Sequence, residues 1–179
     1  RKSVDEYMLM HHGAPADVMP WASGPVDGLD FAARSARLLI DACVAGGVPT
    51  GRALDLGCAV GGASFELARA FGEVEGADYS QAFVDAAEAL RRDGTAAYAL
   101  VEEGEIAVRR EIALDPAIDR SRLRFEQADA HEPPAAWGAF DAVLAANLVD
   151  RLHHPAQALA RFGALVKPGG LLLLTTPYT

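Results

Sequence analysis

Apolar positions recur along the chain at two spacings, and each spacing predicts one kind of element. Five short segments that are apolar throughout or at alternate positions predict strands, at residues 53–56, 73–77, 122–130, 140–147 and 171–179. Three segments with apolar residues three and four positions apart predict helices, at residues 64–71, 81–92 and 155–165. Because strands and helices alternate, we expect an α/β fold with a doubly wound, mostly parallel sheet.

Residues 1–50 precede the first strand and are predicted to form a helical cap. Residues 4–12 are amphipathic and predict a short helix. The Gly- and Pro-rich residues 13–25 are expected to form a loop that Trp21 anchors, and residues 28–44 are expected to form a longer helix.

The remaining core, residues 51–179, contains an insertion at residues 95–122 that is longer than a strand-to-helix connection requires. Apolar residues alternate on both sides of Glu103-Gly104, which predicts a β-hairpin followed by loop. We therefore expect residues 1–179 to form one domain with an N-terminal cap and a hairpin insertion.

The segment ALDLGCAVGGASFELA combines a short strand, a glycine-rich turn and the beginning of a helix. Gly57, Gly61 and Gly62 allow the chain to turn tightly, so that backbone N–H groups approach a ligand closely. About twenty residues later Asp78 ends the second strand, where a carboxylate commonly binds ribose hydroxyls. The pattern predicts a nucleotide-cofactor site.

Two cofactor classes use this arrangement, and the residues favour one of them. The three glycine positions of the dinucleotide fingerprint G-x-G-x-x-G are occupied here by Gly57, Ala59 and Gly62. The second glycine of the fingerprint is the one that admits a pyrophosphate, and alanine replaces it in this chain. Asp55 precedes the turn, where a carboxylate disfavours a diphosphate and favours a cationic amine. S-adenosylmethionine carries an ammonium group and no phosphate. We therefore favour S-adenosylmethionine, with S-adenosylhomocysteine as product, over the NAD of an oxidoreductase.

Composition limits the partners. The chain has 25 acidic and 16 basic side chains and a formal charge of −9, which disfavours nucleic acid and favours a small-molecule substrate. Cys43 and Cys58 match neither a disulfide framework nor a zinc pattern. The sequence has no apolar run that would span a bilayer and no signal-peptide core. We expect a cytoplasmic protein without membrane association.

Polar residues stand at the ends of four predicted strands, where ligands of doubly wound sheets bind. The expected cofactor-binding residues are Asp55, Gly57, Cys58, Ala59, Gly61, Asp78, Tyr79, Ser80, Asp129, Ala130 and Asn147, with His11 from the N-terminal segment.

Four motifs in order, DLGCAVG, Asp78, the ADA after the third strand and KPGGLLLL, resemble those of class I S-adenosylmethionine-dependent methyltransferases. The resemblance covers residues 53–176 and departs at Ala59, where that family usually has glycine. It implies a Rossmann-like sheet. The family's fold adds two strands after the fifth, so we expect the C-terminal strands to be absent and the chain to be part of a longer protein.

A narrower resemblance covers nearly the whole chain. The strings YMLMHHG, LDFAAR, LRRDG, EEGE, LAANL and TTPYT look like those of the methyltransferase of ovothiol biosynthesis. That family methylates an imidazole nitrogen of 5-thiohistidine, and it occurs alone or fused behind a sulfoxide synthase. The resemblance implies an N-methyltransferase with a thiol amino acid as substrate, no metal, and a sulfoxide synthase domain or protein as partner. One departure is Ala32, where the family usually has proline.

The resemblance also implies how the acceptor is held. Arginines suit its carboxylate and tyrosines suit its ring. The expected substrate-binding residues are Arg34, Arg92, Tyr98, Arg151 and Tyr178. Methyl transfer from a sulfonium depends mainly on positioning, and the residues expected at the reaction centre are Asn147, Tyr98 and Tyr7. Two alternatives stay open: a methyltransferase for another small acceptor, at oxygen or carbon, and a non-catalytic cofactor-binding domain of a sulfoxide synthase.

Overall fold

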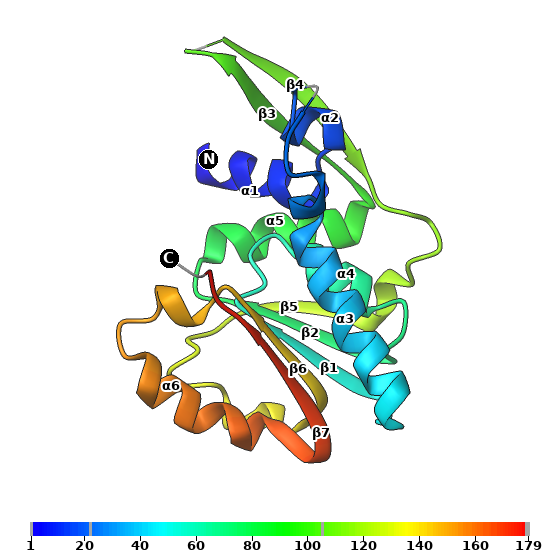
Figure 1. Ribbon diagram of the computed structural model, residues 1–179, viewed down its shortest axis with the longest axis vertical. Coiled ribbons are helices and arrows are strands. Elements are labelled where there is room, and N and C mark those ends of the chain that lie inside the picture. The colour runs from blue at the N-terminus through cyan, green and yellow to red at the C-terminus, as the bar shows by residue number, and fades with distance from the viewer. Residues whose placement is uncertain (1, 22, 105, 178–179) are drawn as a thin grey trace.

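The computed structural model describes residues 2–21, 23–104 and 106–177 (Figure 1). Its main sheet has the strand order β5-β2-β1-β6-β7, and the neighbouring strands are parallel. The strands are β1 (Arg52–Leu56), β2 (Glu73–Asp78), β5 (Leu123–Gln127), β6 (Phe140–Ala146) and β7 (Val166–Thr175). The predicted doubly wound, Rossmann-like sheet is confirmed, and its order reverses between β1 and β6.

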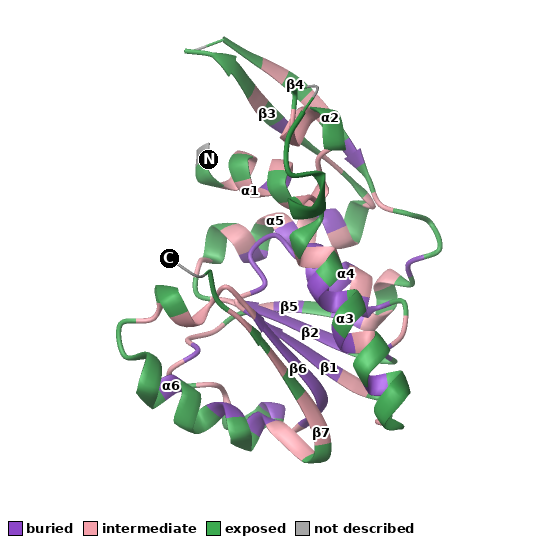
Figure 2. Cartoon of the chain, viewed as in Figure 1, coloured by how far each residue is buried: buried purple, intermediate pink, exposed green. Residues whose placement is uncertain are grey.

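Helices cover both faces of this sheet (Figure 1). They are α3 (Phe31–Gly46), α4 (Gly62–Leu67), α5 (Gln81–Asp93) and α6 (Pro155–Phe162). The first three pack on one face through a core that includes Phe65 and Leu144, and α6 packs on the other through Leu54 and Phe162. Figure 2 shows that β1 and β6 are buried between these layers, as continuous apolar strands of parallel sheets are.

The N-terminal helices and the insertion form a second layer above the sheet. It consists of α1 (Lys2–His12), α2 (Pro15–Val18) and the antiparallel hairpin of β3 (Thr95–Glu103) and β4 (Ile106–Ala113). Figure 1 shows the hairpin projecting beyond the sheet, and α1 packs against both β3 and α5. Met8 and Tyr98 are buried in the same core cluster. The predicted N-terminal helices and hairpin are confirmed.

Several predicted boundaries are corrected. Helix α4 ends at Leu67 rather than at residue 71, because the N–H groups of Arg69 and Ala70 bond to carbonyls three residues back. Helix α6 likewise ends at Phe162, before a 3-10 turn. Among the described residues, the 3-10 turns are Val26–Gly28, Arg120–Arg122, Ala135–Trp137, Val149–Arg151 and Gly163–Leu165.

Two expectations for loops are wrong. Trp21 does not anchor the N-terminal loop, since it is 72% exposed and residues 15–18 form α2 instead. Residues 167–170 lie outside the strand expected at residues 171–179, but in the structure they lie within β7 as a bulge, where the pairing register shifts and Gly169 takes a φ of +81°. Glycine adopts this backbone conformation without steric cost.

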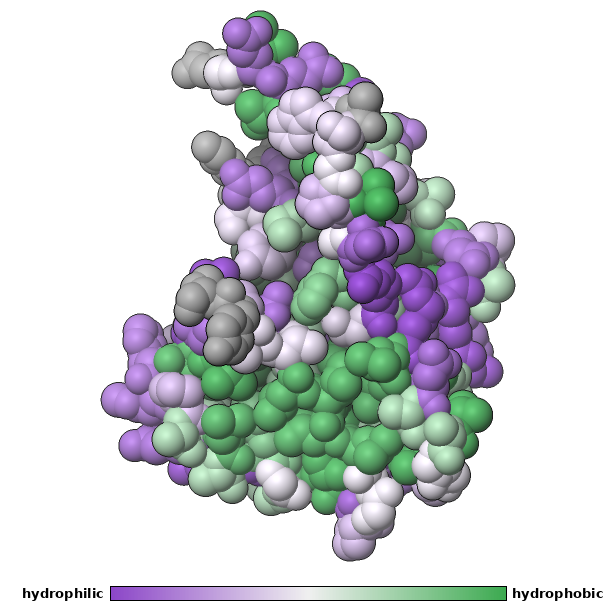
Figure 3. Space-filling view, viewed as in Figure 1, coloured by the Kyte–Doolittle hydropathy of each residue, from purple (hydrophilic) through white to green (hydrophobic). Residues whose placement is uncertain are grey.

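The surface is unevenly polar. Figure 3 shows apolar side chains gathered over the lower part of the viewed face, where β7 and the C-terminal half of α3 lie in Figure 1. Leu171 and Leu173 of β7 pack against the core and keep partial exposure. Within the described residues, no helix is both long and apolar enough to cross a bilayer.

Candidate cofactor site

The turn between β1 and α4 is held in a conformation that only permissive residues adopt easily. Gly57, Ala59 and Gly61 have φ angles of +79°, +49° and +84°, in the left-handed region that favours glycine. The N–H groups of Gly57 and Cys58 donate to the Ala77 carbonyl at 2.7 and 3.0 Å. The glycine loop, residues 57–61, is therefore fixed to the end of β2.

Asp78 fixes the same loop through its side chain. Its Oδ2 accepts the N–H of Ala59 at 2.9 Å, and its Oδ1 accepts the N–H of Ser80 at 2.8 Å. Ser80 stands at the N-cap of α5, and its side chain forms no capping hydrogen bond. Each carboxylate oxygen has more than one lone pair, so Asp78 can bind a ligand hydroxyl while it holds both backbone groups.

Asp55 lies beneath the loop and is only 2% exposed. Its Oδ2 accepts the Ser64 hydroxyl at 2.6 Å. The pKa of Asp55 is raised to about 6, mainly by burial and also by the charge of Asp78, while the hydrogen bonds of Ser64 oppose the rise. A carboxylate that is costly to ionise at a ligand edge is typical of functional sites.

The tips of β5 and β6 supply the other predicted polar residues. Asp129 accepts both the backbone N–H and the ring Nδ1–H of His131, at 2.8 and 2.9 Å. Asn147 has a φ of +50°, and its Oδ1 accepts the Thr175 hydroxyl at 3.0 Å. Ala130 is buried and Tyr79 is 74% exposed. These residues share the carboxyl edge of the sheet with Asp55 and Asp78.

Two histidines of α1 contact the glycine loop from above. His11 Nδ1 accepts the N–H of Gly62 at 3.2 Å, and His12 Nε2 donates to the Val60 carbonyl at 3.0 Å. Burial lowers the pKa of His11 to about 3 and, together with the neighbouring His12, keeps its imidazole neutral. The sequence prediction included His11 but missed His12 and Thr175, whose partners are distant in the chain, and Ser64, whose partner Asp55 lies nine positions earlier.

The aromatic residues predicted for the acceptor lie in the upper layer. Tyr98 is 3% exposed and its hydroxyl donates to Asp17 at 3.4 Å. The Tyr7 ring packs against Phe83, with the ring centroids 4.6 Å apart. Tyr178 lies outside the described residues. Tyr7 and Tyr98 therefore lie near each other in the upper layer, and the Tyr98 hydroxyl is already hydrogen-bonded to Asp17.

The predicted arginines are dispersed. Arg34 is exposed on α3, and Arg151 is exposed after β6 and pairs with Asp150 at 3.2 Å. Arg92 pairs with its neighbour Asp93 at 2.8 Å, in the last turn of α5. That turn lies about 16 Å from the beginning of the helix at 1.5 Å per residue. Arg92 is therefore not brought to the carboxyl edge of the sheet.

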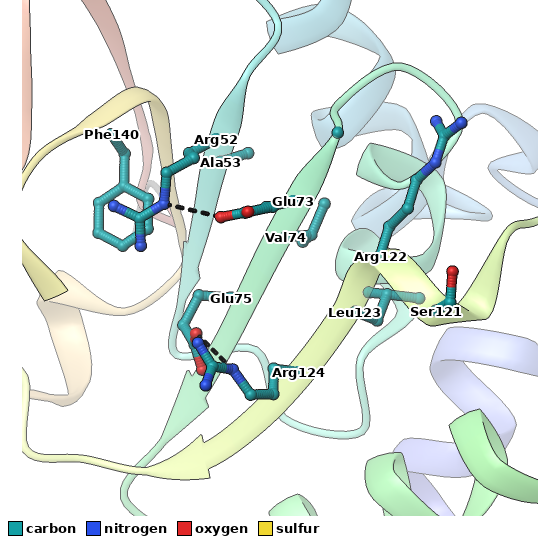
Figure 4. A pocket seen from close by; sticks show the side chains of 11 residues that line it. Arg52, Ala53, Glu73, Val74, Glu75, Ser121, Arg122, Leu123, Arg124 and Phe140 are labelled. Carbon is teal, nitrogen blue, oxygen red and sulfur yellow. Dashed lines mark hydrogen bonds and ion pairs between the residues drawn. The ribbon is translucent and has the colours of Figure 1, made fainter.

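A recess of about 440 Å³ lies at the opposite edge, where the strands begin (Figure 4). Its charges are paired: Arg52 contacts Glu73 at 3.2 Å and Arg124 contacts Glu75 at 3.5 Å. Burial raises the pKa of Glu75 to about 7. Because the glycine loop and Asp78 lie at the other end of these strands, this recess is not the cofactor site.

The described residues contain no group of three or more His, Cys, Asp or Glu side chains placed to hold a metal ion. Cys58 is buried and its Sγ contacts the Ala59 carbonyl at 3.6 Å. Burial raises the pKa of the Cys58 thiol, and the nearby Asp55 and Asp78 raise it further. Cys58 is thus a packing residue of the loop and a poor nucleophile.

The amino-acid sequence is similar to a known protein family and to a curated protein. The sequence profile described as a methyltransferase domain matches residues 30–179. A ubiquinone biosynthesis O-methyltransferase from Alkalilimnicola ehrlichii is 33% identical over 131 residues, which cover 73% of this chain and 43% of that protein.

Solved structures share the fold. CalS10, an amino pentose methyltransferase from Micromonospora echinaspora, superposes with a TM-score of 0.60 at 21% identity, over 82% of this chain and 51% of its own. The [4+2]-cyclase SpnF superposes with a TM-score of 0.63 at 25% identity, over 93% of this chain and 51% of its own. The chain spans about half the length of these relatives. On the profile match across most of its residues, the chain belongs to the methyltransferase domain family.

Proposed function

We propose that this chain binds S-adenosylmethionine at the glycine loop and transfers its methyl group to a small molecule. The observation that carries the proposal is the pair of carboxylates at one sheet edge: buried Asp55 under the loop and Asp78 tied to Ala59. In this assignment Asp78 accepts the ribose hydroxyls and Asp55 attracts the ammonium group. The family match supports the same cofactor.

For the acceptor, we propose an imidazole nitrogen of 5-thiohistidine. The support is the set of strings along the whole chain that resembles the ovothiol methyltransferases, from YMLMHHG to TTPYT. A sulfoxide synthase domain or protein is the corresponding partner. The cofactor supplies the activated methyl group, and the role of the chain is to hold the ring nitrogen in line, which contributes roughly 7–11 kcal/mol in favourable cases. Asn147 at the tip of β6 is the proposed orienting residue.

The upper layer is the proposed cover of the acceptor. Asp17 of α2 accepts from both Tyr98 of β3 and Arg110 of β4, at 3.4 and 3.0 Å, so the N-terminal helices and the hairpin are joined into one unit. Binding loops placed on a rigid scaffold are common in enzymes, and a cover excludes water from the reacting atoms. Tyr7 and Tyr98 are the proposed ring contacts, and Arg34 or Arg151 the proposed carboxylate contact.

A second candidate is methylation of an oxygen acceptor, because the curated relative at 33% identity is named an O-methyltransferase. A third is binding without methyl transfer, since the similar fold of SpnF is named for a cyclase. Both retain the same cofactor loop. The second candidate differs from the first in the acceptor, and the third differs in that no methyl group is transferred.

One pair of measurements separates these candidates. Calorimetry with S-adenosylhomocysteine and with NAD is expected to show binding of the first only. Mass spectrometry of reactions with S-adenosylmethionine and a panel of thiol amino acids and phenols is expected to show a gain of one methyl on 5-thiohistidine. Methylation of a phenol alone would favour the second candidate, and cofactor binding without any methylated product would favour the third.

The unusual backbone of Ala59 permits a prediction. Its φ of +49° costs about 1–2 kcal/mol for a residue with a Cβ, whereas glycine loses about 0.5–1 kcal/mol more entropy on folding. Ala59→Gly is therefore expected to leave the Tm nearly unchanged or slightly raised, and to change S-adenosylhomocysteine affinity less than about threefold. Because Asp55 remains, no NAD binding is expected. Measurable NAD affinity in this variant would contradict the assigned cofactor.

A further inference from the structure

Helix α1 makes an unusually close contact with the beginning of α4. A Cβ atom built on Gly62 would come within 2.7 Å of His11 Nδ1 and 2.9 Å of His11 Cβ. Real side chains do not tolerate such distances, so α1 lies directly on the backbone of the turn. The N–H of Gly62 is one of the N-terminal helix groups that lack an intrahelical acceptor, and His11 Nδ1 provides one at 3.2 Å.

The two histidines contact the turn with opposite polarity. His11 accepts from the N–H of Gly62, and His12 donates to the Val60 carbonyl at 3.0 Å. These two backbone groups flank Gly61, whose φ of +84° sets the shape of the turn. Below the loop, the Ala77 carbonyl and the Asp78 carboxylate hold residues 57–59. The α1 histidines hold the remaining half of the loop from above.

The contacts require one tautomer in both rings. An Nδ1 that accepts leaves the proton of His11 on Nε2, and an Nε2 that donates places the proton of His12 on the same atom. The accepting Nδ1 requires that the His11 ring is neutral. Burial lowers the pKa of each histidine, in agreement with this state.

We propose that His11 and His12 are positioning residues that hold the glycine loop in its cofactor-binding conformation. Through them, the packing of α1 against the loop affects cofactor affinity. They act on the cofactor through the backbone of residues 60–62. The inference rests on the assignment of the glycine loop as the S-adenosylmethionine site under Proposed function.

The test uses substitutions that keep one ring atom at a time. The asparagine Oδ1 occupies the place of histidine Nδ1 and accepts, and the glutamine Nε2 occupies the place of histidine Nε2 and donates. Calorimetry with S-adenosylhomocysteine is expected to show a loss of about tenfold or more for His11→Leu and for His12→Leu. His11→Asn and His12→Gln are expected to recover most of that loss.

The mismatched variants His11→Gln and His12→Asn keep polarity but place the polar atom wrongly, and they are expected to bind as weakly as the leucine variants. Gly62→Ala, which displaces His11 without removing it, is expected to weaken binding too. His153→Asn, on an exposed loop residue, is the matched surface control and is expected to bind normally.

The outcomes separate the two proposals. If the unaltered protein does not bind S-adenosylhomocysteine, the cofactor assignment fails. If it binds, and the leucine variants or the mismatched variants keep full affinity, the positioning role is wrong. Should the leucine variants not fold, the comparison of matched with mismatched variants decides. Imidazole ¹⁵N spectra at pH 7 are expected to show both rings neutral with the proton on Nε2, and a protonated ring would overturn the proposal.

Discussion

Replacing Asp78 with alanine is expected to weaken S-adenosylhomocysteine binding about a hundredfold, which corresponds to about 2.7 kcal/mol. Two ribose hydroxyls donating to one carboxylate form charge-assisted bonds worth about 1.5–3 kcal/mol each. The variant also loses the acceptor of the Ala59 N–H at 2.9 Å, so the loop is less well held. Both losses lower affinity.

Calorimetry on the variant is best paired with two comparisons. Asp85→Ala removes an exposed carboxylate from the outer face of α5 and is expected to leave affinity unchanged. A 2′-deoxy analogue of the ligand separates direct contact from loop bracing: it is expected to bind the unaltered protein less tightly than the parent ligand, and Asp78→Ala with little further discrimination. Equal discrimination in both proteins would remove Asp78 from the ribose contact.

The elements that sequence predicts well are those whose causes are local. A few neighbouring residues determine each of these features. They are the buried strands β1 and β6, the turn glycines Gly57 and Gly61, and Gly94, which ends α5 in a left-handed conformation. The carboxyl edge follows from them, because parallel strands end together. For this reason the strand pattern alone predicts one common edge for Asp55, Asp78, Asp129 and Asn147.

What sequence did not predict depends on partners far along the chain. His12 meets Val60 across 48 positions, and an adjacent pair of histidines gives no sign of such a contact. The N–H of Ser80 donates to the Asp78 carboxylate, which lies two residues earlier at the end of β2. Arg92 was expected at the acceptor, but its neighbour Asp93 pairs with it. Charged side chains often take the nearest partner, which spacing alone does not reveal.

Asp55→Asn is expected to raise stability and lower cofactor affinity together. The pKa of Asp55 rises from 3.8 unfolded to about 6 in the fold, so its ionised form costs up to about 3 kcal/mol at neutral pH. The sign follows from linkage: the folded state binds the proton more tightly, so the cost is fully present above about pH 6 and disappears as the pH falls below 3.8. Asparagine carries no charge and its carbonyl still accepts the Ser64 hydroxyl.

Thermal unfolding of both proteins from pH 4.5 to 8 checks this expectation. The variant is expected to be more stable by about 1–3 kcal/mol at pH 8, because a buried amide N–H offsets part of the gain, and the difference is expected to shrink as the pH falls. S-adenosylhomocysteine affinity, in contrast, is expected to drop about tenfold or more, since the ammonium group loses its opposite charge. Affinity of the unaltered protein is expected to rise with pH through about 6 as Asp55 ionises. A variant that is less stable at pH 8 and binds normally would make Asp55 only an acceptor for Ser64. The expected result would mean that the site keeps an unfavourable buried charge because the ligand uses it.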